Sequence, residues 1–197
     1  MTTIVYLHGF RSSPASIKAA RLSECVAALP APTRPRLHVP ALTDRPAVAV
    51  AGVAAWVDAH AAHDALTFVG SSLGGYYATY LAERYGARGV LINPTTRPYQ
   101  DLEPSCGVQT NLYTGEAFEV TDEHFAELRA LAVPRITRPE RYFLLVETGD
   151  EVLDYRLAVA YYAGAWQYVR GGGDHSFTAF AAQLPAILRF AGVEGVR

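Results

Sequence analysis

Short apolar runs recur along the chain and end in glycine, proline or polar residues, a pattern typical of strands buried in a parallel sheet. The four strongest runs are Thr3–His8, Ala65–Gly70, Gly89–Asn93 and Arg141–Thr148. Two weaker candidates are Arg36–Val39 and Ala165–Arg170. The pattern therefore predicts a sheet of about six strands.

Helix-like stretches alternate with these strands. They are Ser16–Leu29, Arg45–His63, Leu73–Tyr85, Asp122–Leu131, Asp154–Ala163 and Phe177–Ala191. Such alternation favours βαβ units, in which crossover helices cover both faces of a parallel sheet. We therefore expect residues 1–197 to form a single α/β domain with a doubly wound, mainly parallel sheet.

One interval breaks this alternation. Residues 94–140 separate two predicted strands and contain only one clear helix, Asp122–Leu131. Connections of this length are usually functional, and many of them form lids over a site. We expect this interval to be a short cap insertion.

Composition narrows the classes of partner. Half of the 197 residues are hydrophobic, 18% are charged and the net charge is −2, as in an ordinary globular domain. The sequence lacks the excess of basic residues that would indicate nucleic acid or an anionic membrane as a partner. No signal peptide or membrane-spanning apolar run is visible. Cys25 and Cys106 form neither a metal-binding pattern nor a disulfide framework, so we expect a cytoplasmic protein without a metal.

A glycine-rich turn joins the second strong strand to the helix after it. Residues 70–74 read Gly-Ser-Ser-Leu-Gly, which matches G-x-S-x-G with Ser72 at the centre. A nucleophilic serine at such a turn needs small residues two positions before and after it, because neighbouring backbone approaches closely. Centring the pattern on Ser71 would instead place Val69 and Leu73 at those positions. Ser72 is therefore the candidate nucleophile.

A serine hydroxyl needs a base within hydrogen-bond reach and an acid that orients the base. In the α/β-hydrolase fold, for which this turn is typical, the order along the chain is serine, acid, histidine. Asp150 follows a strong strand, and His175 lies in a glycine-rich loop after the last candidate strand. Asp150 is preferred as the acid because it comes first after its strand, while Glu151, Asp154 and Asp174 are the alternatives.

The turn after the first strand reads His8-Gly9-Phe10. In this fold an early strand-to-helix loop supplies one backbone donor of the oxyanion hole, and the residue after the nucleophile supplies the other. We therefore expect the backbone N–H groups of Phe10 and Leu73 to form the oxyanion hole, with the His8 ring as a support.

Several segments together resemble the YqiA/YcfP family of small bacterial α/β-hydrolase-fold esterases. They are YLHGFRSSPASIKA (6–19), GSSLGGYYATYLAERYG (70–86), LINPTTRPY (91–99), NLYTGE (111–116), TGDEVLDYR (148–156) and GGDHSF (172–177). The resemblance implies an esterase of short acyl esters, with acyl-CoA thioesters as a further candidate substrate. It also implies the same catalytic set, Ser72, Asp150 and His175.

The function expected from the sequence is the hydrolysis of a small carboxylic ester or thioester through an acyl-enzyme on Ser72, without a cofactor. Within the cap, Arg97, Tyr99 and Tyr113 are candidate substrate contacts. One alternative is a catalytically silent binding protein on the same fold. Another is a perhydrolase, C–C hydrolase or peptidase that uses the same three residues.

Overall fold

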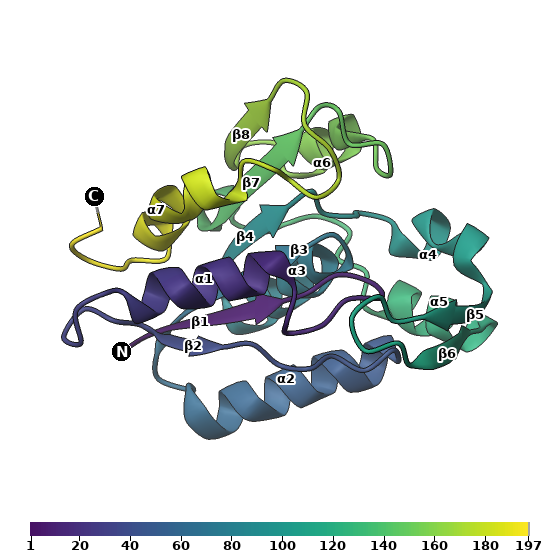
Figure 1. Ribbon diagram of the computed structural model, residues 1–197, viewed down its shortest axis with the longest axis horizontal. Helices are drawn as coiled ribbons and strands as arrows, with labels where there is room; N and C mark the ends of the chain where they lie inside the picture. The colour runs from purple at the N-terminus through teal and green to yellow at the C-terminus, as the bar shows by residue number, and fades with distance from the viewer. Residues whose placement is uncertain (197) are drawn as a thin grey trace.

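The computed structural model describes residues 1–196, which build a parallel sheet with helices packed on both of its faces (Figure 1). Six strands form this sheet in the order β2-β1-β3-β4-β7-β8, and every neighbouring pair is parallel. Their bounds are β1 Thr2–Leu7, β2 Arg36–His38, β3 Ala65–Ser71, β4 Arg88–Ile92, β7 Tyr142–Glu147 and β8 Trp166–Arg170. The predicted number and direction of strands are confirmed.

The burial of each strand explains how clearly it stands out in the sequence. β1, β3, β4 and β7 lie in the middle of the sheet and are buried along most of their length. β2 and β8 are the two edge strands, with half-exposed or exposed side chains. Because an edge strand is covered less completely, its sequence carries a weaker apolar signal.

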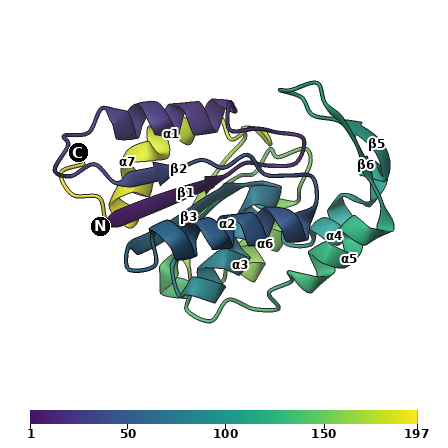
Figure 2. The same cartoon turned by 90° about the horizontal axis from the view of Figure 1, so that it is seen from below.

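Two hydrophobic layers hold the helices against the sheet. α1 (Ile17–Ala27) and α7 (Phe180–Phe190) cover one face, while α2 (Pro46–His60), α3 (Leu73–Tyr85) and α6 (Tyr155–Tyr161) cover the other (Figure 2). Alternate residues of β1 point to opposite layers. Val5 and Leu7 belong to the layer with α2, α3 and α6, and Ile4 and Tyr6 to the layer with α1 and α7. The sheet is therefore buried on both sides, as the continuous apolar runs predict.

The interval 94–140 contains more structure than the sequence suggests. It begins with α4 (Pro98–Asp101) and the 3₁₀ turn η1 (Glu103–Ser105) and ends with α5 (Asp122–Ala130) and the 3₁₀ turn η2 (Pro139–Arg141). Between them lies an unpredicted antiparallel hairpin of β5 (Gly107–Thr110) and β6 (Ala117–Val120). Each strand has four residues, of which two are exposed, and such short, half-exposed strands do not stand out by hydrophobic pattern.

Four helices begin later than predicted, α1, α2 and α6 by one residue and α7 by three. Ser16 precedes α1 as its N-cap residue and is not itself helical. Phe177 has a φ of +56°, which is incompatible with the right-handed helical region, and α7 begins only at Phe180. The segment before α7 is therefore a turn, and this turn directly follows His175.

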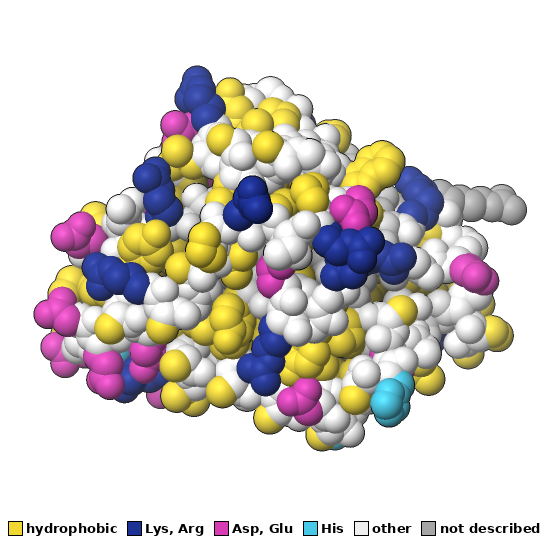
Figure 3. Space-filling model, turned by 180° about the vertical axis from the view of Figure 1, so that it is seen from behind, with side chains coloured by type: hydrophobic (Ala, Val, Ile, Leu, Met, Phe, Trp, Pro, Cys, Tyr) yellow, Lys and Arg dark blue, Asp and Glu magenta, His cyan; other side chains and the backbone are white. Residues whose placement is uncertain are grey.

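Basic and acidic side chains are interspersed with apolar ones over the face seen in Figure 3, without a continuous patch of one sign. Within residues 1–196, no helix is both long enough and apolar enough to span a membrane.

Candidate active site

Ser72 lies at a sharp turn between β3 and α3. Its φ of +56° and ψ of −121° lie outside the regions that residues with a side chain usually adopt. A side chain at Gly70 would overlap the carbonyl of Gly74, and one at Gly74 would overlap the carbonyl of Leu7. The two glycines of the G-x-S-x-G pattern are thus required by close backbone packing.

Hydrogen bonds from β4 and the loop after it stabilise this unusual backbone. The Ser72 N–H donates to the Ile92 carbonyl at 3.0 Å. The Ser72 carbonyl accepts from the N–H groups of Gly75 at 2.9 Å and Thr95 at 3.3 Å. The neighbouring strand therefore fixes the position from which the Ser72 side chain projects.

The Ser72 hydroxyl, the His175 ring and the Asp150 carboxylate form one hydrogen-bonded chain. His175 Nε2 lies 3.1 Å from Ser72 Oγ. His175 Nδ1 lies 2.8 Å from Asp150 Oδ2 and 3.0 Å from Oδ1. These residues follow β3, β8 and β7 respectively, so the contact arises because parallel strands end at one edge of the sheet.

The chain of contacts fixes which ring nitrogen carries the proton. A carboxylate accepts hydrogen bonds only, so the Nδ1–H donates to Asp150 and Nε2 is left to accept from the Ser72 hydroxyl. Burial acts to raise the pKa of Asp150, but hydrogen bonds from the His175 ring and from the Leu153 and Val152 amides outweigh it and lower the pKa. The carboxylate therefore stays charged at neutral pH.

The alternative acids have other contacts. Asp154 is the N-cap of α6, and its side chain accepts from the Arg156 N–H. The Glu151 carboxylate accepts the backbone N–H of His175 at 3.0 Å and makes no contact with its ring. Asp174 also makes no hydrogen bond to the ring within residues 1–196. Asp150 is the carboxylate that the structure brings to the imidazole.

A buried carboxylate that the sequence analysis did not identify holds the loop carrying His175. Glu147 ends β7, and its residue surface is 0% exposed. Its donors come from the segment around His175: the Arg170 guanidinium and the backbone N–H groups of Asp174, Thr178 and Ala179. Burial alone would raise the pKa of Glu147, but these donors hold it below its ordinary value. A charged residue closing an apolar strand was the available signal, because a buried charge requires partners.

Asn93 supports the same loop from β4. Its side-chain N–H₂ donates to the carbonyls of Asp174 at 3.0 Å and His175 at 3.2 Å, and its Oδ1 accepts the Glu147 N–H at 3.0 Å. Asn93 has a φ of +39°, a region in which Asn is among the better-tolerated residues. Glu147 and Asn93 together fix the backbone on both sides of the His175 side chain.

The backbone N–H groups of Phe10 and Leu73 are free to bind a ligand. Within residues 1–196 neither donates to another protein group, and Leu73 opens α3, where first-turn N–H groups have no intrahelical acceptor. Gly9 lies close enough to Ser72 that a Cβ there would be 3.2 Å from Ser72 Cβ. The loop before Phe10 therefore lies directly against the serine.

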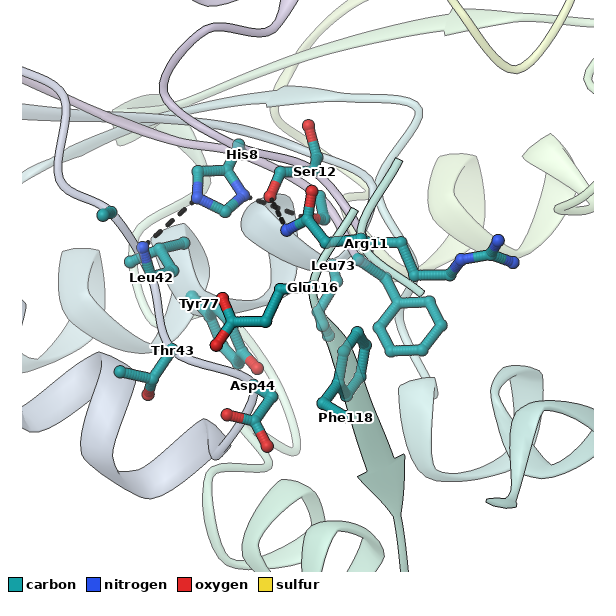
Figure 4. A pocket seen from close by; sticks show the side chains of 14 residues that line it. His8, Arg11, Ser12, Leu42, Thr43, Asp44, Leu73, Tyr77, Glu116 and Phe118 are labelled. Carbon is teal, nitrogen blue, oxygen red and sulfur yellow. Dashed lines mark hydrogen bonds between the residues drawn. The ribbon is translucent and has the colours of Figure 1, made fainter. Parts of the chain in front are cut away.

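His8 stabilises this loop. Its ring is buried, accepts the Leu42 N–H at Nε2 over 3.2 Å and lies 3.1 Å from the Gly9 carbonyl at Nδ1 (Figure 4). Burial lowers the pKa of His8. A neutral ring with its proton on Nδ1 satisfies both contacts, so His8 connects the end of β1 to the segment after β2.

Two hollows adjoin the loop around Phe10. The larger, of about 470 Å³, contains Ser72 and His175 in its wall. The smaller, of about 290 Å³, is lined by His8, Asp44, Leu73 and Phe118 among others (Figure 4). Gly9, Phe10 and Ser12 line both hollows. We refer to the larger one as the Ser72 hollow.

The β5–β6 hairpin completes the Ser72 hollow. Its tip is tied to the loop after β1, because the Leu112 N–H donates to the Arg11 carbonyl at 2.9 Å and the Asn111 side chain donates to the Ser12 carbonyl at 2.9 Å. Leu112 and Tyr113 consequently line the hollow.

Of the three predicted substrate contacts, only Tyr113 lies at this hollow. Arg97 precedes the short helix α4. Tyr99 packs against the hydrophobic core, with the Arg129 guanidinium 5.7 Å from its ring centre. The structure does not bring Arg97 or Tyr99 to the wall of the Ser72 hollow.

We predict that Glu147→Gln will lower the free energy of unfolding by about 3 kcal/mol, because it removes a buried charge from its donors. It should also reduce kcat more than it raises KM, since the His175 loop loses its support. The stabilisation by Glu147 is full above the ordinary glutamate pKa and is lost as the pH falls through the lower pKa of the folded state. The difference in unfolding free energy between wild type and variant should therefore shrink in acid.

Denaturant titrations across pH measure this effect, and Glu140→Gln is the control. Glu140 pairs with Arg138 on the surface, so its loss should change stability by less than about 1 kcal/mol. Equal effects of the two substitutions would show that Glu147 does not hold the loop.

Solved structures of low sequence identity share this fold. A protein of Agrobacterium vitis S4 assigned as a hydrolase is 21% identical, with a TM-score of 0.76 over 98% of this chain and 88% of that one. Mouse alpha/beta hydrolase domain-containing protein 10 is 16% identical, with a TM-score of 0.70 over 95% of this chain and 88% of that one. Est1E of Butyrivibrio proteoclasticus, solved with bound ferulic acid, is 14% identical, with a TM-score of 0.70 over 96% and 88%.

These likenesses establish the α/β-hydrolase fold. At the level of sequence, the model of the uncharacterised protein family UPF0227 matches residues 3–192, nearly the whole chain. The chain belongs to UPF0227, the YqiA/YcfP family.

Proposed function

We propose that this chain is a serine esterase that hydrolyses small carboxylic esters through an acyl-enzyme on Ser72. The observation that carries the proposal is the hydrogen-bonded chain in which His175 lies 3.1 Å from Ser72 Oγ and 2.8 Å from Asp150 Oδ2. It joins a nucleophile, a base and an orienting acid in the geometry that acyl transfer requires.

The mechanism begins when Ser72 Oγ attacks the ester carbonyl and its proton passes to His175 Nε2. Asp150 stabilises the resulting imidazolium through Nδ1–H. The N–H groups of Phe10 and Leu73 bind the oxyanion, and as backbone groups they need no reorganisation. The imidazolium then protonates the departing alkoxide, and the acyl group remains on Ser72.

Deacylation repeats the same steps with water as the nucleophile. His175 Nε2 removes a proton from water, the hydroxide attacks the acyl carbon, and the proton returns to Ser72 Oγ as the carboxylic acid leaves. Thioesters could enter the same sequence with a thiolate as leaving group. No step calls for a metal or an organic cofactor.

The substrate occupies the Ser72 hollow in this proposal. Its wall combines Ser72 and His175 with apolar side chains from α7 and the hairpin, including Phe180 and Leu112. A hollow of about 470 Å³ is of the size of small-molecule sites. Tyr113 is the residue of the cap interval that we propose as a substrate contact.

Catalytic competence is the first prediction of the proposal. A fluorophosphonate probe should label the wild type and Ser71→Ala, whereas Ser72→Ala should not be labelled. Ser71 is the matched control because it is the adjacent serine and also lines the hollow. Labelling that persists in Ser72→Ala would refute Ser72 as the nucleophile, and an unlabelled wild type would favour a silent binding protein.

The role of the acid gives a second prediction. In Asp150→Asn the Oδ1 atom can still accept the N–H groups of Val152 and Leu153, which it binds at 2.9 and 2.8 Å, so the fold should persist. The amide N–H₂ cannot accept from His175 Nδ1–H, and the wrong tautomer should lower kcat by about 10⁴-fold, as in a serine protease with the same triad.

Asp154→Asn is the control for this experiment, because Asn caps a helix as well as Asp does. Its kcat for p-nitrophenyl butyrate should equal that of the wild type. Similar kcat values for the two variants would contradict the assignment of Asp150.

A substrate panel separates the esterase from other hydrolases with the same three residues. We expect turnover of p-nitrophenyl acetate and butyrate and no turnover of a peptide p-nitroanilide, because an amine is a far poorer leaving group than a phenolate. Graded acyl-CoAs in the same panel test thioesters. Faster cleavage of the anilide than of the esters would indicate a peptidase.

A further inference from the structure

We propose that the substrate carries a negatively charged group, a carboxylate or a phosphate, which Lys18 binds inside the Ser72 hollow. This inference rests on the proposed esterase function for its substrate class. The position of the charge beside the catalytic residues, the lack of Asp and Glu side chains in the described wall of the hollow and the apolar remainder of that wall support it in turn.

The wall of the Ser72 hollow is cationic. Lys18 and Arg21 line it, and among residues 1–196 no Asp or Glu does. Arg21 pairs with Glu24 at 3.2 Å, with both side chains largely exposed. Lys18 has no carboxylate oxygen within 4.0 Å of its ammonium in the described part of the chain. Lys18 is therefore the cation available to a ligand.

Lys18 is held beside the catalytic chain. Its Nζ donates to the Ser176 carbonyl at 2.7 Å, and Ser176 directly follows His175. An ammonium has three donors, so two remain for a ligand once this bond is made. A fixed side chain loses less conformational entropy when it binds. A charged group that bonds to Lys18 would thus share the hollow with the scissile carbonyl at Ser72.

The desolvation of Lys18 favours an anionic ligand. Burial lowers the pKa of its ammonium, against the opposite effect of the carboxylates of Asp174, Glu147 and Asp150. Glu147 and Asp150 accept the donors described above, whereas Asp174 Oδ1 has no hydrogen-bond partner among residues 1–196. None of the three residues lines the hollow. An anion that enters the hollow would compensate this half-buried charge directly.

The beginning of α1 adds to the positive potential at this wall. Lys18 is the second residue of this eleven-residue helix, and no side chain caps its first turn. The N-cap Ser16 lines the hollow and is 7% exposed. The unpaired first-turn N–H groups and the helix dipole favour an anion at this end of the helix.

The rest of the wall is apolar and indicates the other part of the substrate. Ile17 and Leu112 line the hollow while remaining 72% and 70% exposed, and Phe177 and Phe180 form its deeper part. Exposed side chains of this kind gathered around a hollow are typical of ligand sites. The ligand chemistry is thus an ester with an apolar body and one anionic substituent.

Matched pairs of esters test the proposal. Mono(4-nitrophenyl) glutarate carries a carboxylate at the end of its acyl chain, and 4-nitrophenyl valerate is its neutral counterpart. 3-Carboxyphenyl butyrate and phenyl butyrate form the corresponding pair for the alcohol side. At low ionic strength, kcat/KM should favour the charged member of at least one pair by about tenfold or more.

Lys18→Met and Arg189→Met each remove one positive charge, the first at the hollow and the second away from it. Lys18→Met should lower the charged-to-neutral ratio of kcat/KM by about tenfold, while Lys18→Arg should preserve most of it. Arg189→Met is the control, since Arg189 is near the far end of α7 and does not line the hollow. A ratio that changes equally in Lys18→Met and Arg189→Met, or a wild type that prefers both neutral esters, would overturn the proposal.

A binding measurement separates this proposal from the esterase function. Phenylacetate and phenyl phosphate should each raise the Tm of the wild type but not of Lys18→Met, and benzyl alcohol should raise neither. The anion that raises the Tm more identifies carboxylate or phosphate as the preferred group. A Lys18-dependent shift without ester hydrolysis would retain the anion site and reject the esterase, whereas no shift with either anion would reject the site.

Discussion

The position of the His175 imidazole determines whether the residues at this edge of the sheet form one hydrogen-bonded chain from Ser72 to Asp150. Ser72 and Asp150 are fixed by the strands that precede them, whereas His175 lies in a loop beyond the edge strand β8. Glu147 and Asn93 bind the backbone of this loop on both sides of the ring. A buried carboxylate without its donors would be strongly destabilising, so the fold and the loop position depend on the same hydrogen bonds.

The strained turn at Ser72 depends on its neighbours in the same way. Its backbone bonds to β4 and to the loop after β4, and Gly74 packs against the end of β1. The unfavourable backbone torsion angles of Ser72 thus occur where contacts with the surrounding strands stabilise them. This arrangement brings the free N–H groups of Phe10 and Leu73 and the Ser72 hydroxyl together beside the hollow.

The layout of the sheet and the set of Ser72, His175 and Asp150 could be predicted from local features of the sequence. These features are buried strands, a glycine-rich turn and the order of residues. The β5–β6 hairpin could not, because its strands have only four residues each and are half exposed. Glu147 and Asn93 act through pairings between residues far apart in sequence, which no single segment reveals. Arg97 and Tyr99 lie in the cap interval but outside its hairpin, and within the described residues it is the hairpin tip that reaches the hollow.

The acyl-enzyme itself is the most direct test of the central claim. A rapid-quench reaction with p-nitrophenyl acetate, followed by mass spectrometry of the intact protein and fragmentation of its peptides, would locate the acetyl group. Our account predicts a transient adduct of one acetyl on Ser72 that decays at the rate of turnover. Turnover without any adduct, or an adduct on another residue such as Ser71, would contradict it.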